Sequence, residues 1–120
     1  MARIMIVDDA AFMRMMLKDI LTKGSHEVVA EAEDGKQCLL SFKDAKPDLV
    51  TLDITMPELD GMSTLLALKK LDPAVKVVMV SAMGQQDSVI QAIKAGARDF
   101  VVKPFQPDRV LDAIAKALAS

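Results

Sequence analysis

Three aspartates that follow apolar segments are the residues of this chain best suited to chemistry. Asp8 and Asp9 come directly after the apolar run Ile4 to Val7, and Asp53 ends the run Leu49 to Leu52. Carboxylates brought close together repel one another and raise each other's proton affinity unless a cation neutralises them. A site made of oxygen ligands suits Mg²⁺, which keeps several waters and helps to bind phosphate oxygens, with Mn²⁺ as a substitute.

Ser81 and Lys103 follow two further apolar segments and complete a candidate phosphoryl-transfer site. Lys103 supplies one positive charge, which cannot balance three carboxylates. A carboxylate beside a cation, a lysine and a hydroxyl suits phosphoryl transfer, which depends on positioning and on neutralising the phosphoryl oxygens. Asp53 would then be the nucleophile, and the product would be an acyl phosphate. An isolated Asp is more often an ordinary turn residue, so this interpretation requires the fold to bring these side chains together.

The hydrophobic pattern predicts five alternations of strand and helix. Apolar runs predict strands at about residues 2–7, 28–30, 49–53, 75–80 and 100–102. Helical spacing of apolar residues follows each strand, and the helices should end at Gly24, before Pro47, at Asp72-Pro73, at Gly96 and near residue 118. The fourth and fifth helices should begin near Gln85 and Pro107.

This alternation predicts one α/β domain over residues 1–120, with a doubly wound five-stranded parallel sheet and right-handed crossovers. The common strand order for five strands is 2-1-3-4-5, as in flavodoxin-like (βα)5 folds. That order places the ends of strands 1 and 3 side by side, and the ends of strands 4 and 5 at the same edge. The three aspartates, Ser81 and Lys103 would therefore converge.

Composition narrows the function classes. With 52% hydrophobic and 27% charged residues, the chain has ordinary globular values, and its net charge of -2 gives no basic surface for nucleic acid. Cys38 is the only cysteine, so no internal disulfide can form and a reducing compartment fits.

No apolar stretch approaches the length needed to cross a membrane, so we expect a cytoplasmic protein. His26, the only histidine, has no second histidine for a metal site or relay.

Four motifs taken together resemble response-regulator receiver domains. They are Asp8-Asp9 and the runs at residues 53–58 (DITMPE), 81–86 (SAMGQQ) and 103–107 (KPFQP). The resemblance covers the whole chain and is greatest to the single-domain chemotaxis regulators outside the enteric type. It implies that Asp53 accepts phosphate from a phosphohistidine on a sensor histidine kinase. Asp9 would bind Mg²⁺ directly and Asp8 through water, with the Thr55 backbone carbonyl as a further ligand.

The resemblance also implies a switch and an output by binding, with no enzymatic activity beyond phosphotransfer and dephosphorylation on the chain itself. Lys103 would contact the phosphoryl group through a turn with a cis Lys103-Pro104 bond, and Ser81 would hydrogen-bond to it. Phe100 would be the switch aromatic. The expected partners of this monomer are the flagellar motor switch or another target, with a phosphatase as a further candidate. The expected partner face, with Val89 and Ile93 as its exposed helical pair, comprises Val89, Ile93, Phe100, Val102, Phe105 and Val110.

Other functions stay open at this point. Within the family, the chain could be a phosphorelay intermediate or an isolated receiver of another regulator, and the lifetime of its phosphoryl group is open because Thr55 and Met83 lack the amide or acid that many members carry. An aspartyl-phosphate phosphatase of the haloacid dehalogenase type needs a second Asp where Thr55 stands. A flavodoxin-like electron carrier is disfavoured because Asp8-Asp9 would repel a flavin phosphate.

Overall fold

A computed structural model describes residues 2–54, 56, 59–82 and 86–119. Five strands alternate with five helices along this part of the chain. The strands are β1 (Arg3–Val7), β2 (Glu27–Ala32), β3 (Leu49–Leu52), β4 (Lys76–Ser81) and β5 (Asp99–Val102). The helices are α1 (Ala11–Lys23), α2 (Gly35–Ala45), α3 (Gly61–Leu71), α4 (Gln86–Lys94) and α5 (Pro107–Ala119).

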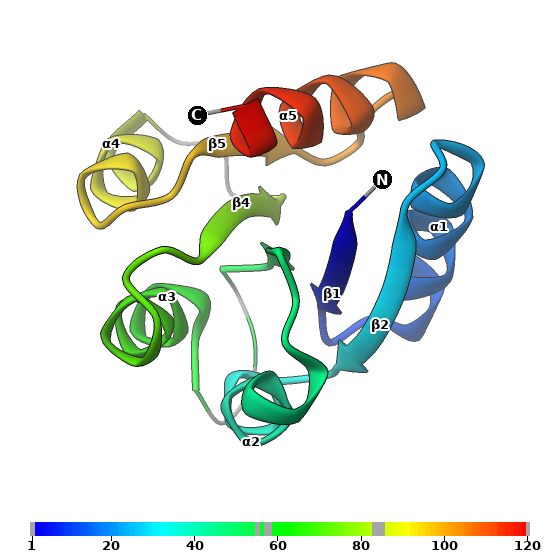
Figure 1. The fold of residues 1–120 in the computed structure, drawn as a ribbon. Helices are drawn as coiled ribbons and strands as arrows, with labels where there is room; N and C mark the ends of the chain where they lie inside the picture. Colours follow the sequence, from blue (N-terminus) through cyan, green and yellow to red (C-terminus); the bar gives the residue numbers. More distant parts are fainter. Residues whose placement is uncertain (1, 55, 57–58, 83–85, 120) are drawn as a thin grey trace.

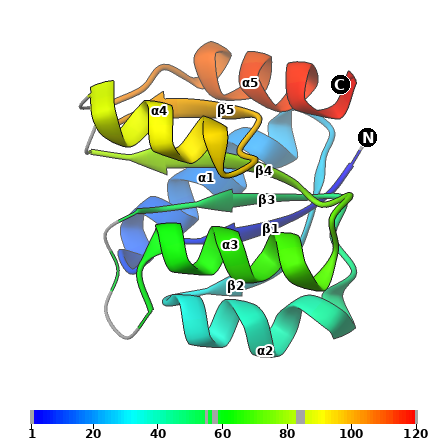
Figure 2. The same ribbon diagram turned by 90° about the vertical axis from the view of Figure 1, so that its left-hand side faces the viewer.

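All five strands are parallel and lie in the order β2-β1-β3-β4-β5, as the sequence predicts. α1 and α5 cover one face of the sheet, and α2, α3 and α4 cover the other (Figures 1 and 2). Each face has its own hydrophobic core. Leu17 and Ile114 fill the α1/α5 side, while Phe42 and Leu65 fill the opposite side. All four residues of β3 are buried, because the strand is covered on both faces.

Local signals set several helix boundaries where the sequence predicts them. The Asp34 carboxylate accepts a hydrogen bond from the Gln37 N–H at the start of α2, and the Asp60 carboxylate accepts one from the Ser63 N–H at the start of α3. These aspartates satisfy backbone donors that a first helical turn leaves free. β2 is longer than predicted, and Ser81 is the last residue of β4 rather than the first of a loop.

None of the helices in the described part of the chain is long and apolar enough to span a membrane.

Candidate functional site

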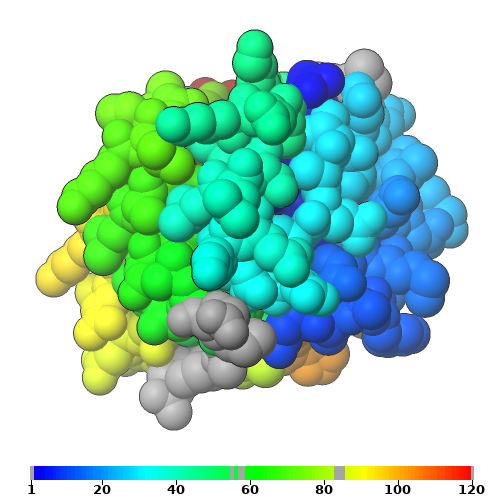
Figure 3. Space-filling model, turned by 90° about the horizontal axis from the view of Figure 1, so that it is seen from below, coloured from blue at the N-terminus to red at the C-terminus, as the bar shows by residue number. Residues whose placement is uncertain are grey.

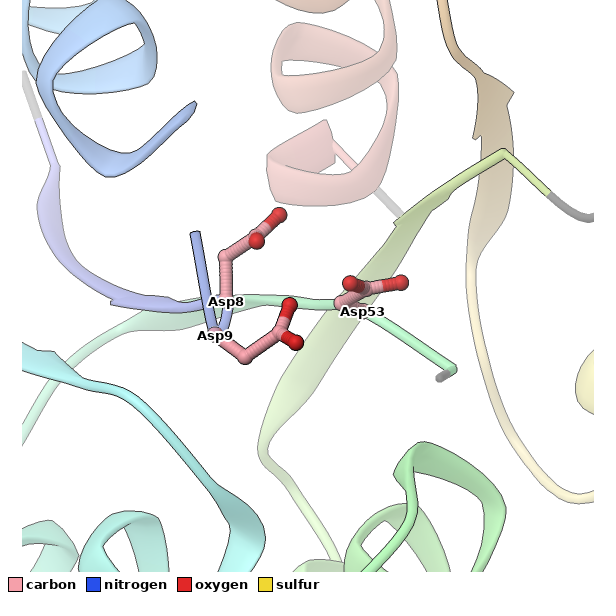
Figure 4. Close-up of side chains that lie close together, drawn as sticks. All are labelled: Asp8, Asp9 and Asp53. Carbon is pink, nitrogen blue, oxygen red and sulfur yellow. The ribbon is translucent and has the colours of Figure 1, made fainter. Parts of the chain in front are cut away.

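The ends of β1 and β3 bring the three aspartates together, as the strand order predicts. The Asp53 N–H donates to the Val7 carbonyl at 3.0 Å, which carries the β1/β3 pairing one residue past β3. On the other side, the Asp8 N–H donates to the Ala32 carbonyl at 3.1 Å. One carboxylate oxygen each from Asp8, Asp9 and Asp53 lies within 4.8 Å of the other two (Figure 4).

The three carboxylates differ in burial and in their partners. Asp8 is fully buried at 0% exposure and Asp53 is 5% exposed, whereas Asp9 is exposed. Both carboxylate oxygens of Asp8 are already engaged by the protein: Oδ1 accepts from the Ala10 N–H at 2.9 Å, and Oδ2 accepts from Lys103 Nζ at 2.6 Å. Asp8 is therefore less available than the exposed Asp9 for direct contact with a cation.

Lys103 joins the cluster from the far edge of the sheet. Its Nζ lies 2.6 Å from Asp8 Oδ2 and 3.5 Å from Asp53 Oδ2. The Lys103 N–H donates to the carbonyl of Ser81 at 2.9 Å, which holds the end of β5 against β4. Ser81 itself is 1% exposed. The Lys103-Pro104 peptide bond is cis, as predicted.

The start of α3 packs directly against the backbone of Asp53. A Cβ atom added to Gly61 would lie 2.1 Å from the Asp53 carbonyl oxygen and 2.5 Å from the Ile54 Cα atom. Both are backbone atoms that cannot move aside, so position 61 accepts only glycine without a shift of the chain. The Gly61 N–H also donates to the Ile54 carbonyl at 2.7 Å. This contact fixes the backbone on which the Asp53 side chain stands.

The donor set fits a hard divalent cation. Three carboxylates face a single lysine, so the cluster has an excess of negative charge in a largely buried place. Oxygen ligands with this excess charge suit Mg²⁺ or Mn²⁺ rather than the softer metals that prefer thiolate or imidazole. The further ligand expected from Thr55 lies outside the described residues, as does Met83.

Sequence reasoning missed Arg14. Its Nη1 donates to the Asp8 backbone carbonyl at 2.6 Å, and its Nε lies 3.5 Å from Glu31 Oε1. The guanidinium thus ties α1 to the end of β1 and to β2. A basic residue one turn into the helix after an acidic pair could have drawn attention to this position, but its contact with a backbone oxygen has no sequence signature.

The prediction that all residues of the expected partner face are exposed is partly wrong. Phe100 and Val110 are buried, with 6% and 1% exposure, and each belongs to one of the two cores. On α4 the exposed apolar pair is Ile90 and Ile93, because Val89 turns inward and packs against the core.

Of the other residues expected on that face, Val102 is 45% exposed and Phe105 is half-buried. The physical reason for the error on β5 is the alternation of its side chains. Phe100 and Val101 enter opposite cores, which leaves Val102 as the exposed apolar residue of the strand.

Residues 4–115 match the model of the response regulator receiver domain. The chain belongs to this family. This receiver domain is 63% identical to the chemotaxis protein CheY of Bacillus subtilis, over 97% of each chain. It is 58% identical to CheY of Thermotoga maritima, over 95% of each. CheY is a standard example of the 2-1-3-4-5 strand order.

Among solved structures, the receiver domain is similar to a chain of the CheX-CheY-BeF₃-Mg²⁺ complex from Borrelia burgdorferi. The TM-score is 0.95 at 32% identity, covering 98% of this chain and 90% of that one. Fold, family and sequence similarity agree, and this chain is a CheY-like response regulator.

Proposed function

We propose that this receiver domain acts in chemotaxis by accepting a phosphoryl group on Asp53 from a sensor histidine kinase. The observation that carries the proposal is the position of Asp53. Its carboxylate stands at the end of the central strand, 5% exposed, beside two other carboxylates and 3.5 Å from Lys103 Nζ. The high identity to CheY proteins of two bacteria supports chemotaxis as the setting.

In the proposed transfer, a carboxylate oxygen of Asp53 forms a bond to phosphorus while the bond between phosphorus and the donor imidazole nitrogen breaks. The nitrogen keeps the electron pair, and the product is an acyl phosphate. Lys103 is close enough to Asp53 to interact with the arriving phosphoryl oxygens once its contact with Asp8 loosens. Ser81, at the end of the neighbouring strand, is the hydroxyl assigned to hydrogen-bond to the phosphoryl group afterwards.

Mg²⁺ is the proposed cofactor, with Mn²⁺ as a substitute. Asp9 and Asp53 would bind the ion directly. Asp8 would stand farther from it, because its two carboxylate oxygens already accept hydrogen bonds from the Ala10 N–H and from Lys103 Nζ. When bound, the ion would neutralise the carboxylates and the phosphoryl oxygens. Mg²⁺ in the Borrelia burgdorferi CheY complex supports this assignment.

The proposed output is a change in target affinity at α4 and β5, with the flagellar motor switch as the leading target. The exposed apolar residues there are Ile90, Ile93 and Val102. Phosphorylation would draw Ser81 inward and favour the inward position of Phe100, which the ring already occupies at 6% exposure. Linkage then requires the target to favour phosphorylation in return. Because the Borrelia burgdorferi relative is found in complex with CheX, a CheX-type protein is a further candidate partner. A phosphatase is also a candidate partner.

The decisive experiment is labelling with radioactive acetyl phosphate or a phosphorylated histidine kinase in the presence of Mg²⁺. Asp53→Asn should abolish the label while circular dichroism shows the same fold. Asp44→Asn, which changes an exposed carboxylate on α2, is the matched control and should be labelled normally. Full labelling of Asp53→Asn would rule out Asp53 as the acceptor.

A further inference from the structure

An apolar groove lies between α2 and α3, away from the aspartate cluster. Figure 3 shows this side of the molecule, on which α2 lies between α3 and β2. The groove consists of two neighbouring hollows of about 350 and 450 Å³, and Leu39 and Leu40 line both. Its apolar lining, here called the leucine groove, comprises Leu39, Leu40, Leu59, Ala67 and Leu71.

Two leucines of the leucine groove expose apolar surface to solvent. Leu40 is 72% exposed and Leu71 is 45% exposed. The core contacts of α2 come from Cys38 and Phe42, which are buried at 0% and 6% exposure, and in part from Leu39. Contiguous exposed apolar patches on a protein surface often mark interaction sites. Leu40 and Leu71 therefore form the candidate contact surface of the groove.

The rim of the leucine groove is positively charged. Lys36 and Lys43, two helical turns apart on α2, line its two hollows, and Lys70 enters from α3. Within residues 2–54, 56, 59–82 and 86–119, none of these three lysines forms an ion pair with a carboxylate. The nearby Asp44 lines a third hollow, between α2 and β2, which Leu40 also lines. Three lysines beside apolar surface, in a chain of net charge -2, favour an acidic ligand at this place.

We propose that the leucine groove binds an amphipathic helix whose apolar stripe is flanked by aspartate or glutamate residues. The apolar stripe would cover Leu40 and Leu71, and the acidic flanks would meet the lysines of the rim. Recognition of an amphipathic helix in an apolar groove is a common mode of peptide binding. The groove is formed by α2 and α3, whereas Ile93 and Val102 of the proposed output face belong to α4 and β5. This inference therefore does not depend on the phosphorylation switch.

The test uses a designed peptide of about 14 residues, long enough for several helical turns, with leucines at helical spacing and glutamates beside them. A second peptide keeps the leucines and replaces every glutamate by lysine. Each is titrated into the uniformly ¹⁵N-labelled full chain while amide chemical shifts are recorded. The acidic peptide should shift amides of α2 and α3, and its binding should weaken by about tenfold between low and high salt. Equal binding of the two peptides, or shifts confined to α4 and β5, would overturn the proposal.

Two pairs of variants locate the binding site. Leu40→Ser should weaken the acidic peptide by at least about tenfold, since it removes apolar side-chain area that the peptide would bury. Leu66→Ser is its control, because Leu66 is 52% exposed on α3 but lies outside the lining of the groove, and it should bind normally. Lys36→Glu combined with Lys43→Glu should also weaken the acidic peptide, whereas Lys94→Glu at the end of α4 should not. Equal losses in Leu40→Ser and Leu66→Ser would contradict the assignment.

Analytical sedimentation of the chain without peptide measures its oligomeric state. It tests whether a second copy of the chain, rather than a peptide, occupies the leucine groove. A monomer in every variant supports the peptide proposal, whereas a dimer that Leu40→Ser abolishes would replace it with self-association. Labelling of Asp53 by acetyl phosphate should be the same in Leu40→Ser and in the unchanged chain. A failure of the proposed phosphotransfer can therefore be told apart from a failure at the groove.

Discussion

Lys103 Nζ lies 2.6 Å from Asp8 Oδ2, an ion pair between the ends of β5 and β1 in which the Asp8 side chain is 1% exposed and the Lys103 side chain is 14% exposed. The same nitrogen lies 3.5 Å from Asp53 Oδ2. One lysine thus contacts two buried carboxylates that carry twice its charge, and Asp9 adds a third carboxylate nearby. The stability of the site and its affinity for a cation must be linked, because both depend on how this negative charge is neutralised.

Removing the lysine should expose that link. Lys103→Met should lower the free energy of unfolding by about 3 kcal/mol in EDTA, because it leaves buried carboxylates without their cation. Mg²⁺ should stabilise Lys103→Met more than it stabilises the unchanged chain, since a ligand that binds only the folded state adds to its stability. Urea denaturation with and without Mg²⁺ measures both effects.

Lys116→Met is the matched control for this experiment. It removes an exposed lysine paired with Asp112 within α5, which should cost no more than about 0.5 kcal/mol. A Mg²⁺ effect equal in Lys103→Met and Lys116→Met would show that Lys103 does not compete with the metal for these carboxylates.

Removing the exposed carboxylate should have the opposite effect on stability. Asp9→Ala should leave the metal-free fold unharmed or make it more stable, because one of three repelling carboxylates is gone. Its affinity for Mg²⁺ should fall by at least about tenfold if Asp9 is a direct ligand. Calorimetric titration with Mg²⁺ measures this affinity, with Asp44→Ala as the control. Unchanged Mg²⁺ affinity in Asp9→Ala would contradict the assignment.

Ile93 tests the proposed output face. Ile93→Asp should weaken binding of the phosphorylated chain to the flagellar motor switch protein of the source organism by at least about tenfold, since it places a charge in an apolar contact. Phosphorylation of Asp53 should proceed normally. Leu66→Asp, an exposed apolar residue on α3, should bind the target as the unchanged chain does. Equal target affinity before and after phosphorylation would disprove the switch itself.

Arg109 and Asp99 connect α5 to the start of β5 and should give the chain a defined acid response. Burial of the Asp99 carboxyl opposes its ionisation, but hydrogen bonds from Arg109 and from the Phe100 N–H outweigh it and lower the pKa of Asp99. A lowered folded-state pKa contributes stability above the unfolded-state value, and that contribution disappears as the pH falls through the folded-state pKa.

Arg109→Gln should therefore reduce stability at neutral pH, by no more than about 1 kcal/mol because the pair is partly exposed. The difference between Arg109→Gln and the unchanged chain should shrink below about pH 4, where Asp99 becomes protonated in the unfolded chain. Urea denaturation at neutral and acid pH measures this. A difference that stays constant into strong acid would show that the Asp99 carboxylate is not its source.

The sequence alone determined the alternation of elements, the strand order and which polar residues meet at one edge of the sheet. Apolar runs of strand length separated by helical repeats admit few arrangements, and parallel strands must end at one edge. Asp8, Asp9, Asp53, Ser81 and Lys103 were therefore recognisable from their places after the apolar runs.

The tertiary structure decided which oxygen each polar group contacts and which apolar side chains remain exposed. Sequence spacing does not reveal that Asp8 is committed to Ala10 and Lys103, or that Arg14 reaches the Asp8 carbonyl. Apolar residues surround much of α4, so only its rotation against the sheet determines that Val89 packs against the core and Ile90 is exposed. Phe100 is buried for the same kind of reason, because its ring fits into the core beneath the neighbouring helices. The local sequence does not reveal the shape of that core.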